Sequence, residues 1–299
     1  MPIHITRREF VAGSFVAGAG ILGIQESWAS MDDRDPDRWA LLSDTHIPST
    51  RDTKREDVSM SDHLIRVSKE VVDLKRMPSG VFINGDCAYL SGLPEDYALL
   101  NELLRPFKDA KLPLHMTLGN HDSRETFWAS VKGATEKSRP LQSKHVSVIE
   151  AKRANWFLVD SLDKTNVTPG LLGDEQLKWL AKALDTHPKK PAIVMGHHQP
   201  AYLTGGIGGL TDSKEFLDVI LPRKHVKAYI FGHTHHWNVT DKEGLHLINL
   251  PPVAYVFQKT DPSGWVDVQL NDAGMSIELR SLDSTHKANG ERHDLKWRT

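Results

Sequence analysis

The sequence contains a single cysteine, Cys87, in 299 residues. One thiol excludes an internal disulfide framework, and it excludes zinc and iron–sulfur sites that are built from several cysteines. The chain also lacks an excess of charge of either sign: the formal net charge is −2, so no basic field directs it to nucleic acid. What remains is an ordinary globular composition, 39% hydrophobic and 25% charged, in a chain long enough to bury a sizeable core.

The first 29 residues have the layout of an export signal. Arg7 and Arg8 begin it, a weakly apolar run with four glycines follows over Phe10–Ile24, and Ser27–Ala29 offers small residues for cleavage. The arginine pair resembles a twin-arginine signal, which exports proteins that are already folded. The apolar run is shorter than the roughly 20 residues of a membrane span, although an uncleaved anchor is the alternative. We expect residues 1–29 to be a signal peptide and the mature protein to be periplasmic or extracellular, without a stable membrane span.

Short apolar runs then alternate with segments of helical spacing. A polar linker covers residues 30–38. Strands are expected at 39–44, 80–86, 112–120, 156–161, 191–196 and 226–232, and helices at 63–75, 94–107, 173–187 and 213–223. This alternation predicts βα units and largely parallel pairing. Further strand runs at 246–257, 264–270 and 274–282 have no helix between them. They predict that a mixed or antiparallel sheet closes an α/β domain over residues 39–285, and that residues 286–299 form a loose tail.

Metal-ligand side chains follow five of these strands. Each strand ends in a cluster of Gly, Asp, Asn or His, and the clusters contain Asp44 and His46; Asp86; Asn120, His121 and Asp122; His197 and His198; His233 and His235. In open α/β sheets, ligands bind outside the carboxyl ends of the strands, so these side chains are expected to converge. Two of the clusters contain i, i+2 pairs, which point the same way in extended backbone.

The ligand types indicate a metal centre. One histidine beside a glycine is ordinarily a core or loop residue, but five such clusters at strand ends form a pattern. Carboxylate, imidazole and amide oxygen without thiolate suit Fe, Mn, Zn or Co. Seven candidate ligands exceed what one tetrahedral ion needs, and they suit two ions that share a carboxylate. Two ions about 3.5–4 Å apart form the clamp used for in-line displacement at phosphorus.

The ordered motifs DTH, GD, GNHD, GHH and GHTH resemble those of the calcineurin-like metallophosphoesterases, from about Trp39 to Leu279. That family includes purple acid phosphatases, class III cyclic-nucleotide phosphodiesterases and glycerophosphodiesterases. The resemblance implies a four-layer α/β/β/α sandwich of two mixed sheets flanked by helices. It also implies a ligand set, in which Asp44, His46 and His235 hold one ion, Asn120, His197 and His233 hold the second, and Asp86 bridges both.

The GNHD motif suggests a catalytic pair. By this hypothesis a metal-bound hydroxide attacks phosphorus, His121 protonates the leaving oxygen as general acid, and Asp122 holds the other ring nitrogen of His121. Asp122 could instead cap the following helix, and His121 could be a passive donor. In the HHQP stretch we take the first histidine, His197, as the ligand, which leaves His198 as a supporting or substrate-binding residue.

The function expected from these observations is hydrolysis of a small phosphoester, with diesters favoured over monoesters. A phosphomonoesterase of the acid-phosphatase kind is the nearest alternative. The near balance of positive and negative charges disfavours a nuclease. The complete set of expected ligands disfavours a non-catalytic metal-binding module. No nucleic-acid partner is expected, and the oligomeric state is left open.

Overall fold

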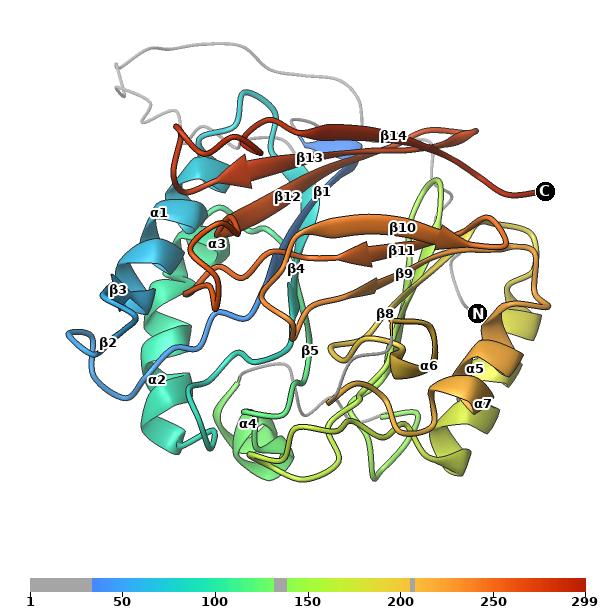
Figure 1. Cartoon of the computed structure of the whole chain (residues 1–299), viewed down its shortest axis with the longest axis horizontal. Coiled ribbons are helices and arrows are strands. Elements are labelled where there is room, and N and C mark those ends of the chain that lie inside the picture. The colour runs from blue at the N-terminus through green and yellow to red at the C-terminus, as the bar shows by residue number, and fades with distance from the viewer. Residues whose placement is uncertain (1–33, 132–138, 205–207) are drawn as a thin grey trace, which may run out of the picture. The chain divides into compact units, whose positions relative to one another are not determined.

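The computed structural model describes residues 34–131, 139–204 and 208–299 (Figure 1). The expected signal peptide, residues 1–29, lies outside the described residues. In the part of the chain that is described, no helix has the length and apolar character needed to cross a membrane.

The described elements follow one another along the chain as strands and helices in alternation, and then as strands alone. They are β1 (Asp35–Ser43), β2 (Lys54–Arg55), β3 (Val58–Ser59), α1 (Met60–Val72), β4 (Pro78–Asn84), α2 (Pro94–Leu103), α3 (Arg105–Asp109), β5 (Leu114–Thr117), α4 (Arg124–Ser130), β6 (Ser147–Glu150), β7 (Asn155–Leu158), α5 (Asp174–Thr186), β8 (Ala192–Met195), α6 (Ala201–Thr204), α7 (Ser213–Ile220), β9 (Val226–Phe231), β10 (Asn238–Lys242), β11 (Leu245–Asn249), β12 (Gly264–Leu270), β13 (Gly274–Ser281) and β14 (Arg292–Lys296).

Two six-stranded sheets contain most of these strands. The strand order is β14-β13-β12-β1-β4-β5 in the first sheet and β10-β11-β9-β8-β7-β6 in the second. Both sheets are mixed: β1, β4 and β5 run parallel while β12 pairs antiparallel with β1, and β7, β8, β9 and β11 run parallel between two antiparallel edge strands. The predicted α/β class with two mixed sheets is confirmed.

The apolar runs lack polar alternation because each central strand is buried on both faces. In β1, Trp39 and Leu41 face the second sheet, while Ala40 and Leu42 face α1, α2 and α3. The second sheet repeats this arrangement, because its outer face packs against α5 and α7. The layers are therefore helices, sheet, sheet and helices, with α1 and α2 on one side and α5 and α7 on the other (Figure 1). The four-layer sandwich expected from the resemblance is confirmed.

The last strand corrects the predicted tail. Residues 292–296 form β14, which pairs antiparallel with β13 from Glu278↔Arg292 to Gly274↔Lys296. Residues 292–296 therefore belong to the sheet rather than to a loose tail. The signal was weak because β14 is an edge strand whose residues are exposed or only partly buried. The predicted linker is also shorter than expected, since β1 begins at Asp35 and already pairs with β4 there.

The run 246–257 was wrongly predicted as one strand. Only β11 forms there, ending at Asn249, because Pro251 and Pro252 cannot donate the hydrogen bonds that a central strand needs. The chain after Pro252 crosses from β11 in the second sheet to β12 in the first. This connection, residues 250–263, passes the ends of the strands that carry the predicted ligands.

An aromatic cluster joins the two sheets near β5. The ring of Phe82 lies 4.5 Å from that of Trp156 and 5.1 Å from those of Trp39 and His115, centroid to centroid. Burial lowers the pKa of His115 from 6.5 to about 4, because a charged imidazole is poorly solvated among these rings. His115 therefore stays neutral in the folded chain at pH values where it is protonated in the unfolded chain.

We expect this residue to make folding sensitive to acid. Its contribution to stability is present above pH 6.5 and is lost as the pH falls toward 4, to a limit of roughly 3 kcal/mol. The variant His115→Phe keeps a ring in the cluster without an ionisable nitrogen, so it should lose less stability over this range. Urea unfolding at pH 7.5 and pH 4.5 measures the difference, and the cost of repacking cancels between the two pH values. Equal acid losses in both proteins would contradict the assignment.

Candidate metal centre

The predicted ligands lie at the carboxyl ends of five parallel strands, three in the first sheet and two in the second. Asp44 and His46 follow β1, Asp86 follows β4, Asn120 follows β5, His197 follows β8, and His233 and His235 follow β9. All of these side chains are buried except that of His233, which is partly exposed. The carboxyl-end rule thus brings together residues up to 191 positions apart.

The ligand atoms form two groups. Asp44, His46 and His235 make one group, and Asp86, His197 and His233 make the other; within each group the atoms lie within 4.8 Å of one another. A third, overlapping group contains His46, Asp86 and His121. Asp86 thus belongs to two of the three groups.

The position of Asp86 fits a shared carboxylate. Its Oδ2 lies 3.2 Å from Nε2 of His197 in one group and 3.7 Å from Nε2 of His46 in the other. Its Oδ1 accepts the backbone N–H of His121 at 2.8 Å, which fixes the carboxylate plane. One oxygen is therefore held by the protein and the other faces both groups.

Three buried atoms of the predicted ligands lack a hydrogen-bond partner. In the described part of the chain they are Asp44 Oδ1, Asn120 Oδ1 and His197 Nε2. A buried polar atom left unpaired costs roughly 1–3 kcal/mol. Asp44 Oδ1 and His197 Nε2 lie 3.8 Å apart and are both good cation ligands, so the residues present fit metal ions there.

The outer nitrogens of two of the histidines, His197 and His235, are held by backbone carbonyls. Nδ1 of His197 donates to Asn84 O at 2.8 Å, and Nδ1 of His235 donates to Tyr255 O at 2.6 Å. Nε2 of His235 and Nε2 of His46 then lie 3.0 Å apart, as two ligands of one ion would. Such outer contacts fix the tautomer and the ring orientation.

The backbone at the centre is left-handed. Asp44, His46, Asp86, His233 and His235 have φ values of 51°, 45°, 44°, 67° and 54°. A non-glycine residue in this region costs roughly 1–2 kcal/mol, and such strain gathers at functional sites. The expectation that the i, i+2 pairs converge through extended backbone is therefore wrong. Asp44 and His46 do share a group, but His233 and His235 belong to different groups.

Two glycines make room for these turns. A Cβ on Gly119 would lie 2.1 Å from Asp86 Oδ1, and one on Gly232 would lie 2.5 Å from Asp44 Oδ2. Both carboxylates therefore approach the backbone of a neighbouring motif more closely than any side chain would allow.

The electrostatics of the centre require positive charge. Burial alone would raise the pKa of Asp44, but His197 and His235 lower it well below its usual range. Burial would likewise lower the pKa of His197, yet the charges of Asp86 and Asp44 raise it to about 10. Burial dominates at His46 and lowers its pKa to about 3. Two carboxylates in one buried place thus attract a cation strongly.

Asp122 has a different role from the one predicted. Its carboxylate accepts hydrogen bonds from the backbone N–H groups of Cys87 (3.2 Å), Ala88 (3.1 Å) and Gly119 (2.9 Å) and from the hydroxyl of Tyr97 (3.0 Å). It does not hold the ring of His121. Nor does it cap α4, because Ser123 is the capping residue. Burial raises the pKa of Asp122 to about 6, and the charge of Asp86 adds to this. The residue ties the loop after β5 to the loop after β4.

His121 is oriented by Leu90 instead. Nδ1 of His121 lies 2.8 Å from the carbonyl oxygen of Leu90 and donates to it. Leu90 has a φ of 56°, so this carbonyl is presented by a strained turn. The His121 ring lies 5.2 Å from the ring of His46, at the edge of the centre. Its Nε2 is thereby directed to the centre.

His198 lies behind the centre. It is fully buried, its Nδ1 lies 2.8 Å from Ser161 Oγ, and its ring lies 4.5 Å from that of His233. The contact with Ser161 agrees with the supporting role, the first of the two roles predicted for His198. The predicted choice of His197 as the ligand is consistent with the grouping.

Sequence reasoning missed Asn84, which joins the two sheets beside the centre. Its Nδ2 donates to Gly196 O at 3.1 Å, and its Oδ1 accepts from Thr117 Oγ1 at 2.7 Å. The signal was a polar residue at the end of an otherwise apolar strand, immediately before the GD motif.

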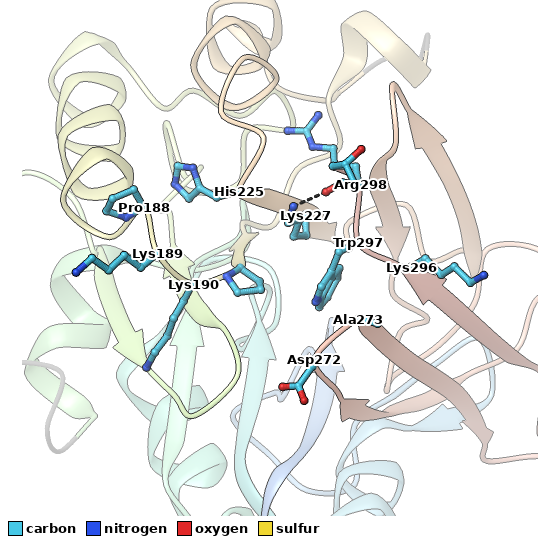
Figure 2. Close-up of a pocket in the computed structure, with 12 residues that line it drawn as sticks. Pro188, Lys189, Lys190, His225, Lys227, Asp272, Ala273, Lys296, Trp297 and Arg298 are labelled. Atoms are coloured by element: carbon cyan, nitrogen blue, oxygen red, sulfur yellow. Dashed lines mark hydrogen bonds between the residues drawn. The ribbon is translucent and has the colours of Figure 1, made fainter.

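A cavity of about 580 Å³ lies elsewhere, at the opposite ends of β8 and β9 (Figure 2). It is lined by lysines, Trp297 and Arg298, but the ammonium groups of Lys190 and Lys296 point in opposite directions (Figure 2). Nζ of Lys227 donates to the carbonyl of Arg298 and to that of Lys224 at 2.7 Å. The charges around this cavity do not converge, so we assign it no role.

Comparisons with known proteins show the family to which the chain belongs. The chain matches the calcineurin-like phosphoesterase family over residues 38–237, and it belongs to that family. It is 24% identical over 245 residues to a 3',5'-cyclic-nucleotide phosphodiesterase of Nostoc sp., covering 80% of this chain and 87% of the relative. It is 28% identical over 204 residues to a protein named probable glycerophosphodiester phosphodiesterase GpdQ of Arcobacter nitrofigilis, covering 67% and 72%.

The fold is similar to that of a solved dimetal phosphatase from Danio rerio, with a TM-score of 0.68 and 15% identity over 88% of this chain and all of that one. Together, the family and the grouped histidines and aspartates identify the chain as a metal-dependent phosphoester hydrolase.

The role of Asp122 can be tested by Asp122→Asn. An amide keeps one acceptor oxygen but turns its own N–H groups toward backbone donors, so unfolding should become easier by about 1–3 kcal/mol. The matched variant Tyr97→Phe removes one of the four donors and should cost about 1 kcal/mol. Denaturant unfolding measures both. If Asp122→Asn instead leaves stability unchanged and alters the pH profile of activity, the structural role given to Asp122 would be wrong.

Proposed function

We propose that this chain hydrolyses phosphodiesters at a centre of two metal ions. In the proposal, Asp44, His46 and His235 hold one ion, Asn120, His197 and His233 hold the other, and Asp86 is shared. The observation that carries it is the position of Asp86 Oδ2 between the two groups. This oxygen lies within 3.7 Å of an imidazole nitrogen in each of them. When bound, the ions would supply an activated water and stabilise charge on the phosphoryl oxygens.

The donor set supports Fe, Mn or Zn as the ions. It combines imidazoles, carboxylates and one amide oxygen without thiolate. The buried, unpaired oxygens of Asp44 and Asn120 and the unpaired Nε2 of His197 also support binding of a cation, because a cation would satisfy them.

The residues of the chain have separate tasks in this reaction. Asn84 and Tyr255 hold the tautomers of His197 and His235 through their carbonyls. Leu90 does the same for His121, so that Nε2 of His121 can carry a proton toward the leaving oxygen. Asp86 fixes the backbone of His121 relative to the centre through the 2.8 Å bond to its N–H.

The similarity to two named phosphodiesterases supports a diester as the substrate. The phosphatase from Danio rerio is similar in fold alone, so it does not favour a monoester. Phosphomonoester hydrolysis is the alternative outcome of the experiment that follows.

Elemental mass spectrometry of the purified chain should find close to two metal ions per chain. Asp86→Asn should bind fewer ions and should lose more activity than the roughly 10- to 100-fold that an outer contact costs, because it removes the shared ligand. The control Asp294→Asn changes an exposed carboxylate on β14 and should change neither value. Bis-p-nitrophenyl phosphate should be preferred over p-nitrophenyl phosphate. At most one ion per chain, with no hydrolysis of either ester after Mn, Fe or Zn is added back, would refute the proposal.

His121→Ala should lower turnover by roughly 10²- to 10⁴-fold on diesters with a poor alkoxide leaving group, because those need a proton. The loss should be much smaller on nitrophenyl esters, whose leaving group departs as the anion. His293→Ala, a partly exposed histidine on β14, is the control. Equal losses on both kinds of ester would show that His121 does not act as the acid.

A further inference from the structure

The connection between β11 and β12 is fixed to the metal centre at three points. The backbone N–H of Val253 donates to Ser43 O at 2.8 Å, and that of Ala254 donates to Asp44 O at 3.1 Å. The carbonyl of Tyr255 accepts from His235 at 2.6 Å. The side chains that follow in the sequence are therefore placed relative to the centre itself.

Phe257 lies flat on one of the candidate ligands. Its ring is stacked on that of His235, with centroids 4.2 Å apart and planes 16° apart. The residue is nevertheless 64% exposed, so its other face is open. Tyr255, only 7% exposed, fills the space behind, with its ring 5.9 Å from that of Phe257 and 5.2 Å from that of His46.

An exposed apolar side chain is ordinary when it stands alone, but this one belongs to a set. The described part of the chain has five exposed large hydrophobic residues. Leu90 accepts the hydrogen bond of His121, Val167 follows Asn166, whose N–H donates to Asn120 O at 2.6 Å, and Phe257 covers His235. Three of the five therefore lie on segments that contact the centre directly. Of these three, Phe257 is the one whose side chain itself lies on a candidate ligand, and an exposed aromatic ring there suits a substrate with a flat apolar arm rather than one with a polyol arm.

A positive charge stands next to the same surface. The guanidinium carbon of Arg55, in the β2–β3 hairpin, lies 6.0 Å from the centroid of the Tyr255 ring. Arg55 is about half exposed, and its ion pair with the neighbouring Glu56 spans 3.5 Å. Tyr255 thus has Arg55 on it and Phe257 as its neighbour, and this combination of aromatic rings and a cation matches a ligand that combines an aromatic base with negative charge.

We propose that the open face of Phe257 stacks the nucleobase of a nucleotide substrate, so that the natural substrate is a nucleotide diester and not a glycerol diester. This inference rests on the proposed function. His235 is both a candidate ligand and the stacking partner of Phe257, so Phe257 lies directly against the centre and its exposed ring is available to the base of a nucleotide held there. Phenylalanine has no polar atom on its ring, so it recognises the flat face of a base and does not distinguish adenine from guanine.

The test compares diesters that differ in the base. With the metal-loaded full chain, Phe257→Ala should raise KM for 3',5'-cyclic AMP and 3',5'-cyclic GMP by about 5- to 100-fold, which is the usual cost of losing one base–aromatic stack. KM for glycerophosphoethanolamine should stay within about twofold. Phe257→Tyr keeps a flat aromatic ring, so its KM for the nucleotides should equal that of the unsubstituted chain. Phe257→Leu keeps an apolar side chain without a ring, so its KM should stay raised. Metal content should be equal in all variants, which separates stacking from support of His235.

Two results would overturn the proposal: equal losses on nucleotide and glycerol diesters, or full rescue by leucine. If the unsubstituted chain hydrolyses no diester, the proposed function has failed, and stacking is tested alone by equilibrium dialysis of 5'-AMP. Weaker AMP binding by Phe257→Ala than by Phe257→Tyr would then support the stack, and equal binding would reject it.

Discussion

The arrangement of the metal centre depends on two buried carboxylates, those of Asp44 and Asp86. They lie at the ends of neighbouring parallel strands, where the sheet brings them close together and removes them from water. Such a pair is stable only with positive charge beside it. The histidines around them, the left-handed backbone and the absence of side chains at Gly119 and Gly232 all follow from that requirement. The strained turns persist because the hydrophobic sandwich around them is large and well packed.

A second layer of contacts makes the arrangement rigid. Asn84 bridges the two sheets, and Asp122 collects four donors from three separate segments. Carbonyl oxygens of Asn84, Leu90 and Tyr255 each bind one imidazole. None of these groups faces the centre, yet each restricts one that does. This division of tasks explains why one motif, GNHD, supplies a candidate ligand, a candidate acid and a structural carboxylate in three consecutive positions.

The sequence was most informative at positions where an apolar strand ends in a residue type that can bind a metal ion. Apolar runs that end in Asp, Asn or His predicted both the layers and the residues that meet at the centre, because parallel strands end on one side of a sheet. The contacts of Asp122 could not be predicted, since three of its donors lie 25 to 35 residues earlier in the chain. The left-handed turns were missed because aspartate and histidine adopt them only under tertiary constraint. The edge strands β10 and β14 are not predicted because each contains a single apolar residue among polar ones, so the sequence shows no repeated apolar–polar alternation. Pro251 and Pro252 do mark the end of β11 in the sequence, because proline cannot donate the hydrogen bond that a central strand needs.

The ligands of the two main groups come from both sheets. Asp44 and His46 end a strand of the first sheet while His235 ends one of the second, and Asp86 of the first sheet meets His197 and His233 of the second. The first sheet alone brings together only the overlapping group of His46, Asp86 and His121. During folding, the two main groups therefore arise only when the two sheets have docked. The complete centre is in this sense a late product of folding, and it marks a chain whose two sheets have come together.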